Sequence, residues 1–184
     1  MVNLSSSTQD AMISAQPLYP SLHLWSALNP DHLNFLSQSL TDFRCIEGFT
    51  PTSYTTVHQT DFKWLTSAIH DIHTIEPERR VVVFSHHTPI LNGTSDPKFL
   101  GGPTNNAFAT KLTRTSVWAK PVVLWAFGHT HWSCNFERDG VRVVGNRLDG
   151  GQGFDARKVI VQELRGVRGN SFTMRLRKLI SGLC

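Results

Sequence analysis

Two short apolar runs that both lead into histidines constrain the fold of this chain more than any other feature. Residues 80–84 (RVVVF) lead into the sequence SHHTP, and residues 121–125 (PVVLW) lead into AFGHTH. Short runs of this kind, rich in Val and aromatic residues, predict buried β-strands. Because a helical pattern precedes the first run, the sequence favours an α/β fold with a strand–helix crossover.

The histidines that follow the two runs point to a metal site. Ligands in open α/β sheets bind at the carboxyl ends of strands, so two adjacent strands would bring His86, His129 and His131 to one edge of the sheet. Histidine is the commonest protein metal ligand, and it binds as the neutral imidazole. A bare His-x-His would favour two solvated loop histidines, but the matching strand contexts favour a metal site.

The segments VVVFSHHTP and WAFGHTH resemble the last two motifs of the calcineurin-like metallophosphoesterases. Further segments resemble the fungal uncharacterised branch of that family, namely LWS at 24–26, HQTDFKWL at 58–65, GTSDP at 93–97 and FAT at 108–110. The resemblance runs from about residue 22 to about residue 163. It implies part of a metallophosphoesterase βαβ sandwich, with mixed sheets, flanking helices and a C-terminal hairpin.

The resemblance also implies a chemistry for the histidines. His86 and His129 would belong to one divalent ion and His131 to another, and His87 would lie near the phosphate as a catalytic residue. The complete family site holds two ions, and mixed imidazole and carboxylate ligands suit Mn, Fe or Zn. The expected activity is therefore metal-dependent hydrolysis of a phosphoester substrate.

Three earlier family motifs, Asp-x-His, Gly-Asp and Gly-Asn-His, should supply the carboxylates. No Gly-Asp dipeptide occurs in the sequence, the Asp-x-His form at Asp71 lies in a helical pattern, and Gly145-Asn146 is followed by Arg147. We therefore expect the carboxy-terminal part of the family domain, a truncated hydrolase of reduced activity that holds one ion or none. Two alternatives stay open: a non-catalytic remnant with a mononuclear metal site, and a basic module that binds anions.

Residues 91–106 are rich in Gly, Pro, Asn, Ser and Thr, which predicts a long loop. Loops of this length in compact domains are often functional. Because the loop follows a ligand-bearing strand, it would form one wall of a substrate pocket, and Lys98 within it would bind the phosphate. A solvated lysine is the alternative.

Local signals predict the elements around the site. A capping-box pattern at residues 56–59, followed by apolar residues at helical spacing up to Ile72, predicts a helix. A second helix is expected over residues 105–118. Asp139-Gly140 between two alternating runs predicts a hairpin with a type I′ turn. Two further strands are expected at residues 22–25 and 158–161.

Composition sets the remaining limits on function and location. With 184 residues, 40% hydrophobic and 17% charged, the chain is long enough for one domain with a hydrophobic core. A net charge of +4 fits an anionic substrate without requiring nucleic acid. Three widely spaced cysteines argue against a disulfide framework and favour a reducing compartment. Because neither a membrane-spanning run nor a signal peptide is visible, we expect a cytoplasmic location.

The chain is expected to divide into three segments. Residues 1–20 are predicted to be poorly ordered, residues 21–164 to form the phosphoesterase domain, and residues 165–184 to form a basic, solvated tail. Strands missing from one side of the sheet would leave an exposed edge, which invites association with another chain.

Overall fold

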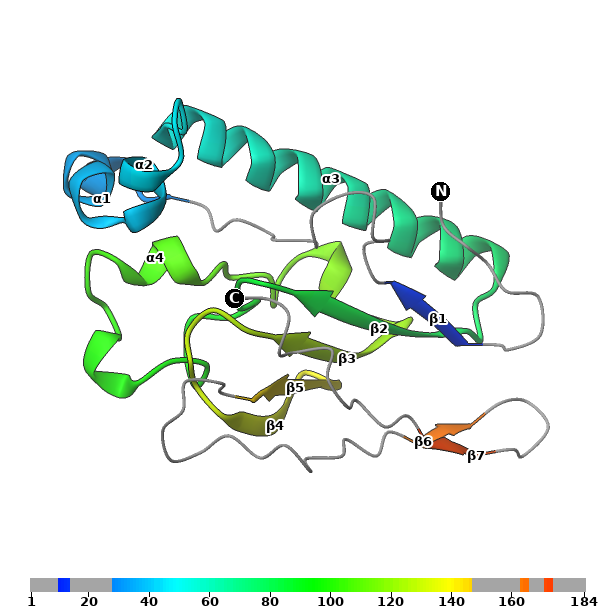
Figure 1. Ribbon diagram of the computed structural model, residues 1–184. Coiled ribbons are helices and arrows are strands. Elements are labelled where there is room, and N and C mark those ends of the chain that lie inside the picture. Colours follow the sequence, from blue (N-terminus) through cyan, green and yellow to red (C-terminus); the bar gives the residue numbers. More distant parts are fainter. Residues whose placement is uncertain (1–9, 14–27, 147–162, 166–170, 174–184) are drawn as a thin grey trace.

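The structure is a computed structural model that describes residues 10–13, 28–146, 163–165 and 171–173. Its main element is a five-stranded sheet with the strand order β1-β2-β3-β5-β4 (Figure 1). The strands of this sheet are β1 (Asp10–Ile13), β2 (Arg80–Ser85), β3 (Val122–Phe127), β4 (Cys134–Arg138) and β5 (Val141–Gly145). Strands β1, β2, β3 and β5 run parallel, whereas β4 pairs antiparallel with β5. The predicted α/β class with a mixed sheet is therefore confirmed.

The hairpin predicted from the Asp-Gly pair joins β4 to β5. Asp139 and Gly140 both have positive φ, 50° and 79°, as a type I′ turn requires. β4 is the outermost strand on this side of the sheet, and its residues Asn135, Glu137 and Arg138 are exposed. Charged side chains on an edge strand disfavour pairing with a further strand.

Helices lie over one face of the sheet and at one end of it. The helical elements are η1 (Pro30–His32), α1 (Leu33–Ser39), α2 (Thr41–Cys45), α3 (Pro51–Ile75), η2 (Pro97–Phe99), α4 (Asn105–Phe108) and η3 (Ser116–Trp118). The long α3 runs along one face of the sheet, and α4 lies beyond the arrowheads of β2 and β3 (Figure 1). The carboxyl ends of the two histidine-bearing strands therefore face α4.

α3 begins earlier than the capping-box pattern predicts. Its N-cap is Thr50, whose hydroxyl accepts from Ser53 N at 3.2 Å while the Ser53 hydroxyl accepts from Thr50 N at 2.7 Å. Pro51 fills the first helical position, where the N–H that proline lacks would have no partner within the helix. Thr56 lies inside the helix and donates its hydroxyl to Thr52 O. The helix is confirmed, but the predicted start is wrong because the true capping box uses Ser in place of Glu or Gln.

The helix expected over residues 105–118 is wrong, since only its two ends are helical, as α4 and η3. Between these ends, Thr110 N donates to Thr88 O and Leu112 N donates to Pro89 O, each at 3.0 Å. These backbone donors are used by the segment that follows β2 rather than by a further helical turn. Tertiary pairing therefore ends α4 after one turn.

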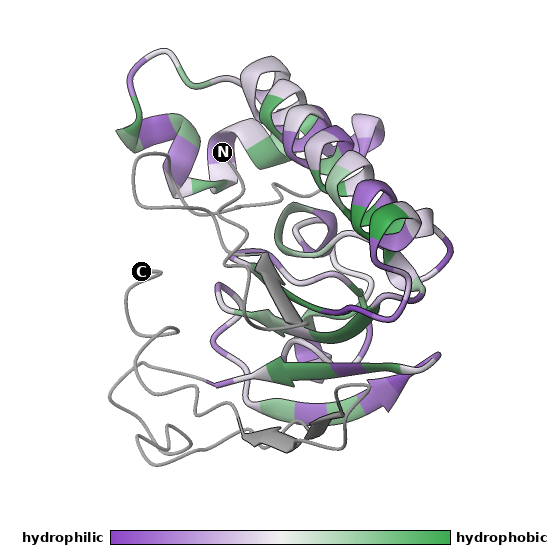
Figure 2. Cartoon of the chain, turned by 90° about the vertical axis from the view of Figure 1, so that its right-hand side faces the viewer, coloured by the Kyte–Doolittle hydropathy of each residue, from purple (hydrophilic) through white to green (hydrophobic). Residues whose placement is uncertain are grey.

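The two faces of the sheet bury different sets of side chains. The face under α3 carries large residues, which pack with the apolar side of the helix: Val81, Val83, Trp125, Phe127, Val143, Leu65, Ile69 and Ile72. The opposite face buries a smaller cluster without an aromatic ring among its buried members: Val82, Leu124, Ala126 and Val144. Figure 2 shows that β5 is mainly hydrophobic, whereas hydrophilic residues recur along β4. The central strands β2 and β3 are thus fixed by burial on both faces.

The terminal segments contribute three short strands. β1 pairs with β2 and lies within residues 1–20, where the sequence predicted no strand. β6 (Glu163–Arg165) and β7 (Ser171–Thr173) form a separate two-stranded antiparallel sheet at the predicted start of the basic tail. The strands expected at residues 22–25 and 158–161 lie outside the described residues. No helix in the described part of the chain has the length and apolar character needed to cross a membrane.

Candidate metal centre

The two histidine-bearing segments meet because β2 and β3 are parallel neighbours that end together. Ser85 of β2 pairs with Phe127 of β3 at their carboxyl ends. The ladder continues one step further, where Gly128 N donates to His86 O at 3.1 Å. The chain therefore leaves the sheet at the same edge after both strands, as the apolar runs predict.

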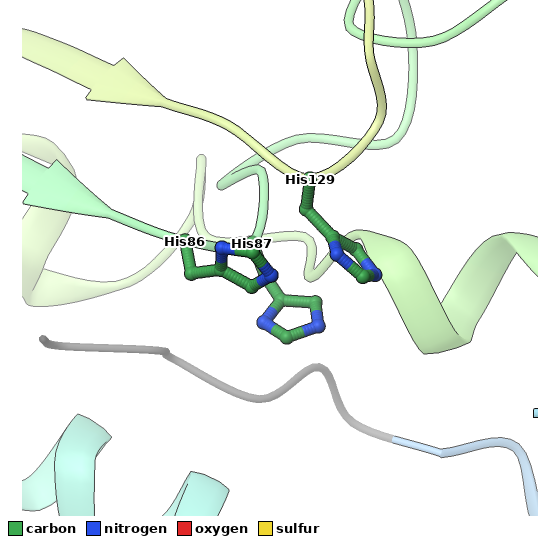
Figure 3. Close-up of side chains that lie close together, drawn as sticks. All are labelled: His86, His87 and His129. Carbon is green, nitrogen blue, oxygen red and sulfur yellow. The ribbon is translucent and has the colours of Figure 1, made fainter. Parts of the chain in front are cut away.

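Three imidazoles gather at this edge, those of His86, His87 and His129 (Figure 3). The ring centroids lie 4.4 Å apart for His86 and His129, 4.3 Å for His87 and His129, and 5.0 Å for His86 and His87. One nitrogen from each ring lies within 4.8 Å of the other two. In a tetrahedral site with Zn–N bonds of about 2.0–2.1 Å, the nitrogens are roughly 3.3 Å apart. Small side-chain rotations would therefore place all three nitrogens around one ion.

His131 is not a member of this group, although the sequence predicts it as a metal ligand. It is exposed, and it lies two residues beyond His129 on the same turn. The third place belongs to His87, which the sequence predicts as a catalytic residue near the phosphate and which is only 1% exposed. The structure thus brings His86 and His129 together as expected, while the metal role of His131 and the catalytic role of His87 stay predictions.

The His86–His87 segment is bonded directly to the core. The Ser85 hydroxyl donates to His87 O at 2.6 Å and accepts from Trp125 Nε1 at 2.8 Å. Ser85, Trp125 and His87 are each at most 1% exposed. Because these bonds are buried and Trp125 packs under α3, the backbone at His87 is tied to the position of the core.

The segment that carries His129 adopts a strained backbone instead. His129 and His131 both have left-handed φ, 57° and 51°, a region that residues other than Gly rarely occupy. The turn lies close to the end of β5, because a Cβ added at Gly145 would lie 2.5 Å from Trp132 O. Gly145 is therefore the residue that allows this close approach. Residues in such sparsely populated backbone conformations occur most often at functional sites.

Aromatic rings border the histidine group. The Phe108 ring of α4 lies 4.8 Å from the His129 ring, and Tyr54 of α3 approaches the His87 ring edge-on at 6.3 Å. The Tyr54 hydroxyl donates to Ala107 O at 2.6 Å and so joins α3 to α4. The contacts of these two aromatic residues with the histidines were not predicted from the sequence, because neither residue lies next to a histidine motif in the chain.

Two further residues, Lys98 and Cys134, lie outside the histidine group. Lys98, predicted to bind phosphate, is exposed in η2, where its Nζ lies 3.0 Å from Asp96 Oδ2 and 4.8 Å from the centre of the Phe99 ring. Cys134 begins β4 and packs against the core cluster under α3. The phosphate-binding role of Lys98 stays a prediction.

No family model matches the sequence. Among curated proteins, the chain is similar to the uncharacterised protein L509 of Acanthamoeba polyphaga mimivirus, with 28% identity over 138 residues, which cover 68% of this chain and 47% of the viral protein. Among solved structures, it is similar to the phosphopantetheinyl hydrolase PptH of Mycobacterium tuberculosis, with a TM-score of 0.40, 15% identity, and coverage of 67% of this chain and 44% of the other. The chain therefore spans less than half the length of either protein.

Proposed function

We propose that this chain carries part of a metal-dependent phosphoester hydrolase site, in which His86, His87 and His129 bind one divalent ion. The observation that carries the proposal is the convergence of three imidazoles from the ends of two adjacent parallel strands. Phosphoester chemistry is supported by the segments SHHTP and GHTH, which supply these histidines and resemble metallophosphoesterase motifs.

The donor set favours zinc among the divalent metals. Imidazole suits zinc, iron and related ions, whereas magnesium and calcium prefer oxygen ligands. A bound ion of this kind polarises a phosphoryl oxygen and lowers the pKa of coordinated water toward neutrality. The chain itself positions the three nitrogens, and the rings of Phe108 and Tyr54 lie beside those of His129 and His87. To bind the substrate phosphate, the Lys98 ammonium group would give up its ion pair with the Asp96 carboxylate and pair with the phosphate.

We expect one ion and slow turnover. Among the described residues, the group contains three histidines and no carboxylate. A two-metal clamp acts on both the attacking and the leaving oxygen, so one ion supplies only part of that stabilisation. The all-imidazole donor set also favours a second candidate, a remnant that binds zinc without turnover.

Zinc affinity of the full chain, measured by competition with a chromogenic chelator, tests the site. His129→Ala should weaken zinc binding by at least about 100-fold, beyond the 10–100-fold typical of residues that only support a ligand. His70→Ala is the matched control, because His70 is exposed on α3. The proposal is wrong if the wild-type chain binds no zinc, or if the control loses as much affinity as His129→Ala.

Turnover separates the two candidates. The wild-type chain is assayed with p-nitrophenyl phosphate and bis(p-nitrophenyl) phosphate in the presence of zinc or manganese. Slow metal-dependent turnover that His129→Ala abolishes supports the hydrolase, and stoichiometric zinc without turnover supports the remnant. Fast turnover that His131→Ala also abolishes would contradict the single-ion site, because His131 would then complete a two-ion centre.

A further inference from the structure

The two segments that carry the histidines are joined by the hydroxyl groups of three threonines. The Thr130 hydroxyl donates to Thr94 O at 2.6 Å, and the Thr94 hydroxyl donates to Ile90 O at 2.6 Å. The Thr88 hydroxyl donates to the same carbonyl, Ile90 O, at 3.1 Å. Thr88, Thr94 and Thr130 thus form a continuous path of hydrogen bonds, which we call the threonine network.

Both ends of the threonine network lie next to a histidine of the candidate site. Thr88 follows His87 directly in the chain, and Thr130 follows His129. Thr88 and Thr94 are 1% and 0% exposed, and Thr130 is half-buried. The hydroxyls of Thr88 and Thr94 are shielded from water, so solvent does not compete for their hydrogen bonds, whereas the Thr130 bond is partly exposed.

The threonine network acts on the strained part of the site. His129 has a left-handed φ of 57°, a conformation that residues other than Gly rarely adopt. Such a conformation persists only where its surroundings hold it. The Thr130 hydroxyl helps to keep this conformation, because its hydrogen bond to Thr94 O joins the turn to the loop between Ile90 and η2.

We propose that the threonine network is a positioning device, which sets the distance between the His87 and His129 rings and thereby the affinity and geometry of the metal site. This inference rests on the proposed function. A site whose ligands are held in place before the metal binds loses less conformational freedom on binding, so it binds more tightly. The network is separate from the ligands themselves, because the hydrogen bonds that form it join the hydroxyls to backbone groups and not to the histidine rings: Thr88, Thr94 and Thr130 donate to carbonyls, and the Thr88 hydroxyl also accepts from Ile90 N.

Three substitutions isolate the hydroxyl of Thr130. Thr130→Val keeps the branched shape and removes the hydroxyl, whereas Thr130→Ser keeps the hydroxyl and removes the methyl group. Thr115→Val is the matched control, because the half-buried Thr115 hydroxyl also donates to a backbone carbonyl, Leu112 O at 2.8 Å, outside the threonine network. If Thr130→Val does not fold, Thr130→Ala replaces it, since alanine removes the hydroxyl without adding volume.

Two measurements on the full chain read out the position of the ligands. Zinc affinity is measured by chelator competition, and the visible absorption of the Co²⁺-loaded chain reports the geometry of the ligands. Thr130→Val should weaken zinc binding about 10–100-fold, as the loss of a supporting partner does, and should shift the Co²⁺ spectrum. Thr130→Ser and Thr115→Val should leave both readings close to those of the wild type.

The outcomes separate this inference from the proposed function. If the wild-type chain binds zinc and Thr130→Val binds it equally well with an unchanged Co²⁺ spectrum, the positioning role is wrong and the metal site stands. An equal loss of affinity in Thr115→Val would also overturn the inference, because the effect would then be one of general stability. If the wild-type chain binds neither zinc nor Co²⁺, the proposed function fails, and the positioning role fails with it.

Discussion

The two chain segments that carry the histidines are held in place by different means. The β2 arm, residues 85–88, continues from its strand without positive φ and is bonded to the core through the Ser85 hydroxyl. The β3 arm, residues 128–131, turns sharply, with left-handed φ at both of its histidines. Its Thr130 hydroxyl bonds a loop rather than the sheet.

The two halves of the site therefore depend on different parts of the molecule for their positions. A histidine whose backbone is bonded to the core moves only when the core moves. His129 lies on a strained turn, and its position depends on the hydrogen bond that the Thr130 hydroxyl donates to the loop. The β2 arm thus fixes where the site is, and the β3 arm determines how closely the third ring approaches.

The largest expected effect is the pH dependence of zinc binding, which tests whether both arms contribute ligands. Zinc requires neutral imidazoles, so protons compete with it below the ordinary histidine pKa of about 6.5. Each ligand weakens affinity by up to about tenfold per pH unit, and three ligands by up to about a thousandfold. The slope of the logarithm of Kd against pH, measured by chelator competition, should therefore approach minus three in the wild-type chain once the pH lies below the pKa values of all three rings.

The His129→Ala variant is the control for this slope, because it removes the contribution of the β3 arm. Its slope should approach minus two, because two histidines remain on the β2 arm. An unchanged slope would show that the β3 arm does not bind the metal.

The next effect concerns the anchor of the β2 arm. Ser85→Ala removes the hydroxyl that bonds both Trp125 Nε1 and His87 O. Each buried polar group deprived of its partner costs about 1–3 kcal/mol, so the free energy of unfolding should fall by about 2–6 kcal/mol. Urea unfolding followed by tryptophan fluorescence measures this change.

Ser37→Ala is the matched control for Ser85→Ala, because its exposed hydroxyl donates to Asn34 O. It should change the free energy of unfolding by no more than about 0.5 kcal/mol. If Ser85→Ala is equally mild, the β2 arm is not anchored through this hydroxyl.

A smaller effect is expected at Gly145, where the end of β5 lies against the two residues that flank the β3 arm, Phe127 and Trp132. A Cβ at Gly145 would lie 2.5 Å from Trp132 O and 2.9 Å from the Phe127 ring, so Gly145→Ala should destabilise the chain by about 1–3 kcal/mol. Gly128→Ala is the control, because a Cβ there would lie 3.8 Å from His86 O, an ordinary contact. Urea unfolding of both variants compares them. Equal losses would contradict the close approach at Gly145.

The fold could be predicted where the signal is local. The apolar runs predict β2 and β3, and the Asp139-Gly140 pair predicts the hairpin, since these patterns depend only on neighbouring residues. The helix expected over residues 105–118 failed because the backbone donors of Thr110 and Leu112 bond a segment distant in the sequence. No local propensity reveals such tertiary pairing.

The candidate site could be predicted only in part, for a similar reason. The convergence of His86 and His129 follows from the register of two strands, which their apolar patterns indicate. The place of His131 away from them follows the left-handed backbone of the β3 arm, whereas the place of His87 depends on the buried bonds of the β2 arm. His-x-His alone does not predict φ, so the sequence could not decide which second histidine would join the group.

The smallest expected effect tests why the β3 arm keeps a left-handed residue at His131. Asn tolerates this region better than His does, so His131→Asn should raise the free energy of unfolding by about 0.5 kcal/mol. His70→Asn makes the same change on the ordinary helical backbone of α3 and should have almost no effect, because the two residues have similar helix propensities. Urea unfolding measures stability, and chelator competition measures zinc affinity in the same samples.

If His131→Asn stabilises the chain and leaves zinc affinity unchanged, the strain at residue 131 serves no ligand of the ion held by the other three histidines. If it weakens zinc binding, the His131 ring reaches the ion once metal is present, and the β3 arm must then move to bring it there.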